Sequence, residues 1–201
     1  MLKTLLCLGD SYTIGEQVML TDSFPYQTLQ LLRKSGMNIT APEIIAKTGW
    51  TTDELNACIE SKIFSEQYDF VTLLIGVNNQ YRGREVENYK IEFEMLLKKA
   101  ISFAGNHSQH VFVISIPDWG VTPFAEGRDR AVIAKEIDAY NEACEKITKE
   151  NQCYFIDITA AQRKDAGDPA MIAEDGLHPS GKEYSKWAKL LSEKIISLRS
   201  S

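Results

Sequence analysis

Five short apolar runs, separated by longer segments with helical periodicity, limit the possible folds of this chain more than any other feature. The runs cover residues 4–8, 39–46, 70–75, 111–116 and 153–158. The last four contain β-branched or aromatic clusters, which suit strands that are covered on both faces. Because strands that alternate with helices form parallel sheets through helical crossovers, we predict an α/β fold with a five-stranded parallel sheet.

The segments between the runs carry helix signals. Ser23 can cap a helix with Pro25 in its first turn, and Thr51 and Glu54 have the spacing of a capping box. Ser180 can open the last helix. Three stripes of apolar residues recur at helical intervals and would cover the sheet: Tyr89, Phe93, Leu96, Leu97 and Ala100; Ile133, Ile137, Tyr140, Cys144 and Ile147; and Tyr184, Trp187, Ala188, Leu191 and Ile195.

Length and composition fit one buried core. With 201 residues, of which 44% are hydrophobic, the chain is predicted to form a single domain over residues 1–201. Its 22 basic and 28 acidic side chains form no long run of one sign, which argues against binding to nucleic acid or to an anionic membrane. The four cysteines lack a short repeated spacing, so we expect reduced thiols. The sequence does not indicate an oligomeric state.

No apolar segment approaches the roughly 20 residues that a membrane span requires. The apolar start of the chain is too short for a signal peptide and leads directly into a glycine, so we interpret it as the first strand. A cytoplasmic location is therefore the default expectation. A secreted or periplasmic location stays open if a targeting segment precedes this sequence.

The motif Gly9-Asp10-Ser11 follows the first apolar run without a gap. A glycine at the end of a buried strand places the next hydroxyl at the carboxyl edge of the sheet, where open α/β proteins bind ligands. Ser11 is therefore a candidate nucleophile. Asp10 is its neighbour and is expected to fix the loop through backbone N–H groups.

A serine hydroxyl needs a neighbouring base to take its proton, and an imidazole base needs a carboxylate to orient it. The stretch from Asp175 to Pro179 supplies Asp175 and His178 three positions apart. The other two histidines, His107 and His110, precede the fourth strand and are expected at the opposite edge of the sheet. The sequence thus predicts Ser11, Asp175 and His178 as catalytic residues.

Nucleophilic attack on a carbonyl also needs donors for the oxyanion of the tetrahedral intermediate. Candidates are the backbone N–H groups of Ser11 and Gly49 and the side-chain amide of Asn78, each near the end of a different strand. Gly49 has no Cβ, so its backbone can approach a ligand closely. These groups would share one hollow with the catalytic residues.

With these motifs in place, the chain resembles the SGNH (GDSL-type) hydrolase family. The blocks of that family are matched in order by Gly9-Asp10-Ser11, Gly49, the segment from Gly76 to Asn79, and the segment from Asp175 to Pro179. The resemblance implies a flavodoxin-like, three-layer α/β/α fold and an esterase, thioesterase or lysophospholipase type of reaction on a small acylated substrate. It also implies the catalytic and oxyanion roles given above. No metal or other cofactor is implied.

Two residues depart from the family pattern. Tyr12 stands where a leucine usually follows the serine, and Asn79 stands where an aspartate often follows the asparagine. We expect Tyr12 to narrow the pocket and Asn79 to weaken a contact that fixes the loop.

Two long connections, 117–130 and 163–174, leave the same edge of the sheet and are expected to be irregular because of their prolines and glycines. We expect both to wall the pocket. Aromatic residues at this edge are candidate substrate-binding residues, although ordinary packing accounts for them equally well: Tyr12, Trp50, Tyr81, Trp119 and Phe124.

Other functions fit parts of the pattern. A flavodoxin-like FMN-binding module would use the hydroxyls and N–H groups after the first strand to hold a phosphate, but it gives no role to Asp175 and His178. A silent binding protein for acylated or glycan ligands would not need an intact Ser11, Asn78, Asp175 and His178. An acyltransferase with a sugar hydroxyl as acceptor would share the acyl-enzyme and stays open.

Overall fold

The computed structural model describes residues 1–65 and 67–198, and the strands in these ranges form one parallel sheet. The strand order is β2-β1-β3-β4-β5, which is the flavodoxin-like order. The strands are β1 (Leu5–Gly9), β2 (Glu43–Ala46), β3 (Phe70–Leu74), β4 (Val111–Ile114) and β5 (Tyr154–Ile156). The predicted five-stranded parallel α/β fold is confirmed.

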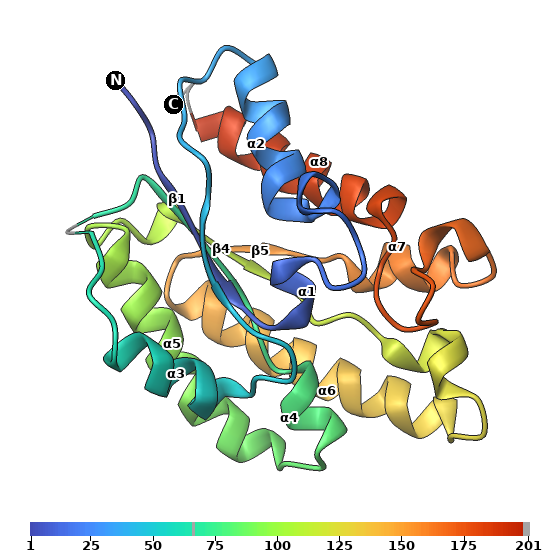
Figure 1. Ribbon diagram of the computed structural model, residues 1–201. Helices are drawn as coiled ribbons and strands as arrows, with labels where there is room; N and C mark the ends of the chain where they lie inside the picture. The colour runs from blue at the N-terminus through green and yellow to red at the C-terminus, as the bar shows by residue number, and fades with distance from the viewer. Residues whose placement is uncertain (66, 199–201) are drawn as a thin grey trace.

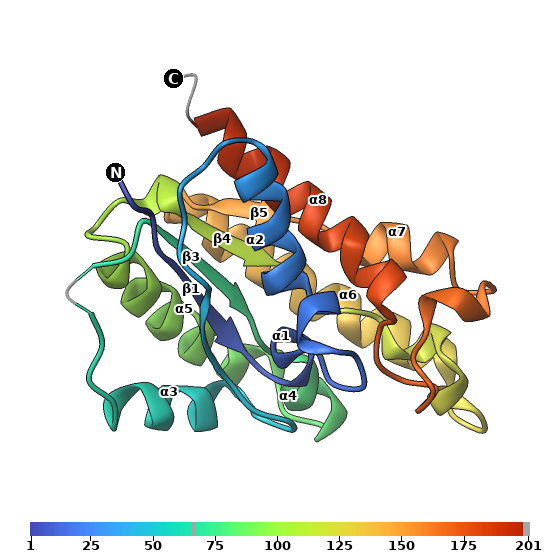
Figure 2. The ribbon, with the colours of Figure 1, turned by 45° about the horizontal axis from the view of Figure 1, so that its top comes forward.

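Eight α-helices connect and follow the strands within the described residues. They are α1 (Ser11–Ile14), α2 (Phe24–Lys34), α3 (Thr52–Glu60), α4 (Val77–Tyr81), α5 (Val86–Phe103), α6 (Arg130–Glu150), α7 (Thr159–Lys164) and α8 (Gly181–Ser197). Figures 1 and 2 show α2 and α8 side by side on one face of the sheet, and α3, α5 and α6 on the other. The three layers of the predicted architecture are therefore present.

Helix starts follow the predicted caps with one exception. The capping box of α3 is complete, since the Thr51 N–H donates to Glu54 Oε2 over 2.9 Å. Ser180 Oγ accepts from the Glu183 N–H at the start of α8. Ser23 precedes α2 as predicted, but its hydroxyl donates to the Leu20 carbonyl and does not cap the helix.

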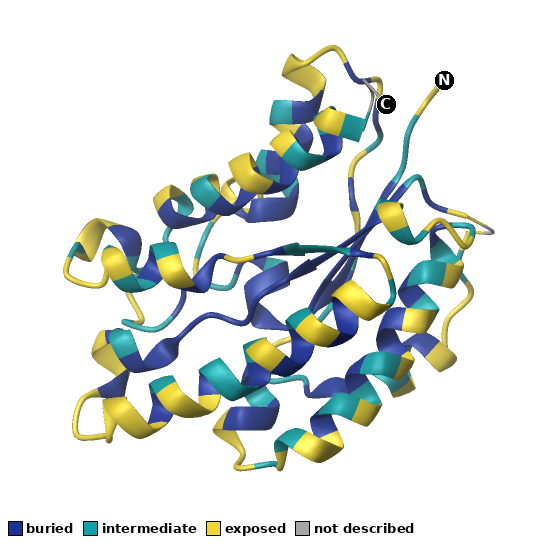
Figure 3. Cartoon of the chain, turned by 180° about the vertical axis from the view of Figure 1, so that it is seen from behind, coloured by how far each residue is buried: buried dark blue, intermediate teal, exposed yellow. Residues whose placement is uncertain are grey.

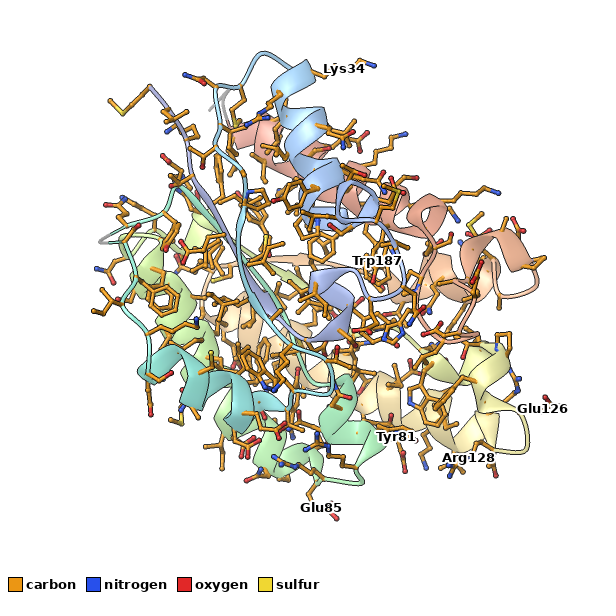
Figure 4. All side chains as sticks on the ribbon, viewed as in Figure 1. Lys34, Tyr81, Glu85, Glu126, Arg128 and Trp187 are labelled. Carbon is orange, nitrogen blue, oxygen red and sulfur yellow. The ribbon has the colours of Figure 1, made fainter. Side chains whose placement is uncertain are left out.

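The strands and the inward helix faces form the core. In Figure 3 the central strands β1, β3 and β4 are dark blue, while the outer faces of the helices are largely yellow. The side chain of Trp187 in α8, labelled in Figure 4, is 1% exposed, and its ring lies 6.2 Å from that of Phe24 in α2. The two helices thus bury a shared aromatic cluster above the sheet.

Three segments differ from the predicted boundaries. The second strand begins at Glu43 and not at residue 39, because Pro42 has no N–H to donate to the sheet. Residues 117–130 contain two 3₁₀-helices, η3 (Trp119–Val121) and η4 (Pro123–Ala125). Residues 163–174 begin with the end of α7 and contain η5 (Pro169–Met171), so this connection is more regular than expected.

Two further 3₁₀-helices lie in the described residues, η1 (Leu20–Asp22) and η2 (Ser108–His110). All four cysteines are free, as predicted. Within the ranges that the structure describes, no helix combines the length and the apolar character needed to cross a bilayer.

Candidate active site

Ser11, Asn78 and His178 line one pocket of about 130 Å³. It lies at the carboxyl edge of the sheet, where β1 and β3 lead into α1 and α4. The remaining lining residues are apolar or aromatic: Tyr12, Val77, Tyr81, Trp119, Phe124 and Leu177. The predicted nucleophile and the predicted base, 167 positions apart in the sequence, therefore face the same small space.

Ser11 is the first residue of α1 and follows the buried strand β1 directly. Gly9 makes the tight entry possible, because a Cβ at this position would lie 2.1 Å from Thr13 Oγ1 and 2.5 Å from the Leu74 carbonyl oxygen. Since the first N–H groups of a helix have no partner within it, the Ser11 N–H is suited to bind an anion.

Asp10 caps α1 and is fully buried. Its Oδ1 accepts from the Tyr12 N–H over 3.0 Å, and its Oδ2 lies 3.4 Å from Asn78 Nδ2. The carboxyl fixes the loop through a backbone N–H, as predicted. Burial raises the pKa of Asp10 to about 7, although both hydrogen bonds favour the ionised form.

His178 and Asp175 form the closest polar contact of the site. His178 Nδ1 lies 2.5 Å from Asp175 Oδ2, and Asp175 Oδ1 accepts from the backbone N–H groups of Leu177 and His178. Partial burial acts to raise the pKa of Asp175, but these hydrogen bonds outweigh it and lower the pKa below its ordinary value. With Nδ1 donating to the carboxylate, Nε2 is the ring nitrogen that can accept a proton.

The loop that carries His178 is held on two sides. The Ala173 N–H donates to the His178 carbonyl, and the Phe124 N–H donates to the Gly176 carbonyl over 2.9 Å. Gly176 has φ +71°, a conformation that favours glycine. The imidazole is therefore placed by backbone hydrogen bonds as well as by Asp175.

Gly49 lies in the loop between β2 and α3 and has φ +82°. It is not among the residues that line the pocket, but its loop contacts two of the elements that form it. Asn78 Nδ2 donates to the Trp50 carbonyl over 3.0 Å, and Arg82 Nη2 donates to the Gly49 carbonyl over 2.6 Å. On the other side, the Thr48 hydroxyl hydrogen-bonds Glu16, just after α1.

Asn79 contacts the start of α3 and is fully buried. Its Oδ1 accepts from the Thr52 N–H over 3.1 Å, and its Nδ2 donates to Thr52 Oγ1 over 2.6 Å. The Thr52 hydroxyl in turn hydrogen-bonds the Glu92 carboxylate. The contact with the loop is therefore present with asparagine, whose amide makes two hydrogen bonds here.

Four of the five aromatic candidates line the pocket, and one does not. Tyr12 lies 5.2 Å from the His178 ring, and Tyr81 lies 5.3 Å from Trp119 in an edge-to-face arrangement. Phe124 completes this wall, 6.0 Å from Trp119. The Trp50 side chain lies outside the lining, and only its carbonyl takes part through Asn78.

The two long connections contribute unequally. Residues 117–130 supply Trp119 and Phe124, and Arg163 anchors this loop through an ion pair of 2.8 Å with the buried Asp118. Residues 163–174 supply no lining residue of the pocket, contrary to expectation. His110 lies beside Phe70 at the start of β3, so it is at the opposite edge of the sheet, as predicted.

Three contributors to this region were not predicted. Val77 and Leu177 line the pocket and are sequence neighbours of Asn78 and His178, so the motifs themselves point to them. Arg82 is the third contributor, and its side chain is 42% exposed. Its contact with Gly49 joins residues 33 positions apart, for which the sequence carries no signal.

Together, the sheet order and the pocket define a flavodoxin-like α/β protein with a serine, a histidine and an asparagine gathered at the carboxyl edge of its sheet. The chain belongs to the GDSL-like lipase/acylhydrolase family, whose model matches residues 7–186. The resemblance seen in the sequence is thereby confirmed.

Individual relatives agree with this assignment. An acetylxylan esterase from Geobacillus stearothermophilus is 25% identical over 142 residues, which are 66% of this chain and 62% of that enzyme, so the match spans less than two thirds of its length. The solved structure of Axe2, an acetylxylan esterase from the same organism, has a TM-score of 0.76 at 20% identity and covers 96% of this chain and 94% of its own.

Two further structures share the fold. A lipase/acylhydrolase from Enterococcus faecalis has a TM-score of 0.76 at 19% identity, covering 96% of this chain and 95% of its own. TesA has a TM-score of 0.74 at 16% identity, and the match covers 96% of this chain and 98% of TesA. These comparisons give no support to the FMN-binding or acyltransferase alternatives.

Proposed function

We propose that this chain hydrolyses carboxylic esters of small acyl groups and that Ser11 is the nucleophile. The observation that supports this most is the shared pocket. Ser11 and Asn78 line it with His178, whose Nδ1 is held by Asp175 at 2.5 Å. A nucleophile, an oriented base and an amide donor in one small space are the requirements for acyl transfer to a serine.

In the proposed reaction, Ser11 Oγ attacks the acyl carbon while His178 Nε2 takes the hydroxyl proton. The tetrahedral intermediate collapses, the C–O bond to the alcohol breaks, and His178 returns the proton to the leaving alcohol. Water then attacks the acyl-enzyme with His178 as base again, which releases the acid and restores Ser11. Asp175 keeps the imidazole in the required tautomer and stabilises its charged form.

The N–H groups of Ser11 and Gly49 and the Asn78 amide are proposed to hold the oxyanion. One hydrogen of Asn78 Nδ2 is used by the Trp50 carbonyl at 3.0 Å, which fixes the direction of the amide. The second contact, to Asp10, is long at 3.4 Å. We propose that this second hydrogen shifts from Asp10 to the oxyanion when substrate binds.

Pocket size supports a short acyl group. A volume of about 130 Å³ is small, because ligand pockets for drug-sized molecules occupy roughly 300 Å³ or more. We propose that Tyr12, Tyr81, Trp119 and Phe124 form the walls against which the acyl group packs. This mechanism requires no cofactor.

The test uses p-nitrophenyl acetate and the Ser11→Ala variant. Wild-type protein should release p-nitrophenol, and Ser11→Ala should reduce the release to the uncatalysed rate, because this variant lacks the hydroxyl that is proposed to form the acyl-enzyme. Ser185→Ala, an exposed serine on α8, is the matched control and should keep full activity. A fluorophosphonate should label wild-type protein at Ser11. Activity that persists in Ser11→Ala would remove this serine from the mechanism.

A further inference from the structure

A groove continues from the pocket across the surface between α4 and α6, and we call it the α4–α6 groove. Its first part has a volume of about 400 Å³ and shares Tyr81 and Trp119 with the pocket. Its second part, of about 380 Å³, shares Gln80 and Glu136 with the first and reaches Glu85. Together they provide far more space than the pocket that holds Ser11.

Tyr81 stands where the pocket meets the groove. Its side chain is 48% exposed, and its ring is fixed edge-to-face against Trp119. Figure 4 labels Tyr81, Arg128 and Glu85 along the lower edge of the molecule. An exposed, rigid aromatic ring beside polar groups can pack against the C–H face of a sugar ring.

Hydrogen-bonding groups in the groove are held in place by one another. Gln80 is 5% exposed; its Oε1 accepts from Trp119 Nε1 and its Nε2 donates to Glu136 Oε2, each over 2.7 Å. A carboxylate has two oxygens with about four acceptor positions, so Glu136 retains capacity for ligand hydroxyl groups. Fixed acceptors of this kind suit a ligand with several hydroxyls.

The charges of the groove argue against other ligands. Arg128, Asp129 and Glu136 line its first part, and Lys135 and Glu85 line its second. Covering these charges with a long acyl chain would remove them from water without compensation. The mixture of signs also gives no net field that would attract a polyanion.

We propose that the α4–α6 groove binds the carbohydrate part of an acylated oligosaccharide. The acyl group occupies the Ser11 pocket, the first sugar rings pack over Tyr81, and later rings run toward Glu136. The leaving group is then a sugar hydroxyl, which takes its proton from His178 when the C–O bond breaks. This inference rests on the proposed ester hydrolysis and adds the nature of the alcohol.

The first experiment compares acetyl esters that differ only in the alcohol: p-nitrophenyl acetate and acetylated xylose, xylobiose and xylotriose. The specificity constant kcat/KM should rise about tenfold or more from one ring to three, which corresponds to about 1.4 kcal/mol of added binding. A flat series would overturn the inference. A preference for long-chain acylglycerols over all the sugar esters would overturn it as well.

The second experiment narrows the groove by substitution. Val132 lies in the groove wall on α6 and is 48% exposed, so Val132→Trp should be tolerated by the fold. It should reduce kcat/KM for acetylated xylotriose about tenfold more than for p-nitrophenyl acetate. Ile91→Trp, on the exposed face of α5 outside the groove, is the matched control and should not change this ratio. Glu136→Ala is a second variant, and it should likewise reduce kcat/KM for acetylated xylotriose more than for p-nitrophenyl acetate.

These outcomes separate the two proposals. If Ser11→Ala retains p-nitrophenyl acetate cleavage, the proposed function fails. If wild-type protein cleaves p-nitrophenyl acetate through Ser11 but Val132→Trp and Glu136→Ala reduce both substrates equally, only the groove assignment fails. Unacetylated xylotriose should bind to Ser11→Ala, as measured by titration calorimetry. This binding should be lost in the double variant that carries Ser11→Ala and Val132→Trp.

Discussion

Arg82 lies outside the pocket, yet its guanidinium holds the loop that carries Gly49. Its Nη2 donates to the Gly49 carbonyl over 2.6 Å, while Nη1 lies 3.3 Å from Glu54 at the start of α3. Asn78, one helical turn earlier in α4, holds the next carbonyl of the same loop. The side chains of Asn78 in α4 and of Arg82, directly after α4, thus hold the Gly49 peptide in place.

Replacement of Arg82 by methionine should therefore act on the rate. We expect kcat to fall about tenfold with little change in KM, because a displaced Gly49 N–H weakens binding of the oxyanion and not of the ester. Arg82→Lys should recover part of the loss. Arg84→Met, which removes the neighbouring pair with Asp53, is the control. If Arg82→Met changes KM by the same factor as kcat, Arg82 does not act by positioning the Gly49 N–H.

Asp10 predicts a pH dependence of stability. Burial raises its pKa in the folded protein to about 7 from an ordinary value of 3.8. Between these values the folded state binds more protons than the unfolded state, so the free energy of unfolding decreases as pH rises. From about pH 5 to pH 7 the loss should reach roughly 3 kcal/mol at most, at 1.36 kcal/mol per unit.

Urea unfolding of wild-type protein and Asp10→Asn at several pH values would measure this slope. Asp10→Asn places an amide against Asn78 and should be less stable, but its free energy of unfolding should change less between about pH 5 and pH 7. The comparison cancels the opposite contribution of His110, whose pKa burial lowers. Parallel pH curves for the two proteins would show that the Asp10 carboxyl is ionised throughout.

At the scale of elements, α3, α4 and α5 meet at a chain of hydrogen bonds through Asn79, Thr52 and Glu92. The Thr52 hydroxyl bonds the Glu92 carboxylate, so it faces Asn79 Nδ2 as an acceptor. An amide is therefore the side chain that this joint requires, and an aspartate would place an acceptor opposite an acceptor. The departure from the family pattern at Asn79 has a local structural cause.

Asn79→Asp should for this reason destabilise the protein. We expect a decrease in the free energy of unfolding of about 1–3 kcal/mol, because one buried hydrogen bond is lost and a carboxylate is placed near that of Glu92. Thermal and urea unfolding would measure it, with Asn38→Asp, an exposed position between α2 and β2, as the control. Unchanged stability of Asn79→Asp would mean that the Thr52 hydroxyl can turn without cost.

Elements differ in how far the sequence predicts them. The strands and the blocks around Ser11, Asn78 and His178 were predictable, because the first two closely follow strand ends and His178 closely precedes the last helix. The short helix α7 was missed, since Thr159 and Gln162 are its only buried residues and give no periodic stripe. The α4–α6 groove was not predictable, because it is a space between two helix surfaces that only packing brings together.

At the scale of the whole molecule, the helix layer of α2 and α8 supports the site through a cluster of aromatic side chains. Trp187 in α8 contacts Phe24 in α2 and lies 6.4 Å from Tyr12, which in turn lies beside the His178 ring. The aromatic cluster thus connects the packing of α2 and α8 to the pocket itself. Loss of this cluster should lower both the free energy of unfolding and the catalytic activity.

Trp187→Ala should lower the free energy of unfolding by about 3–5 kcal/mol, the usual cost of removing a fully buried aromatic side chain. Leu190→Ala, 40% exposed on the same helix, should cost far less. Urea unfolding followed by circular dichroism would compare them. A loss for Trp187→Ala below about 1 kcal/mol would show that the cluster can repack.

Ser11 begins the first helix of the chain, whereas His178 lies three residues before α8. During translation, strands β1 to β5 can leave the ribosome and start to assemble while the histidine is still being added. On the proposed assignment, a nascent polypeptide carries its serine for most of its synthesis without a base to activate it. Esterase activity would therefore begin only after His178 has been added, so that a product of translation that ends before this residue is inert.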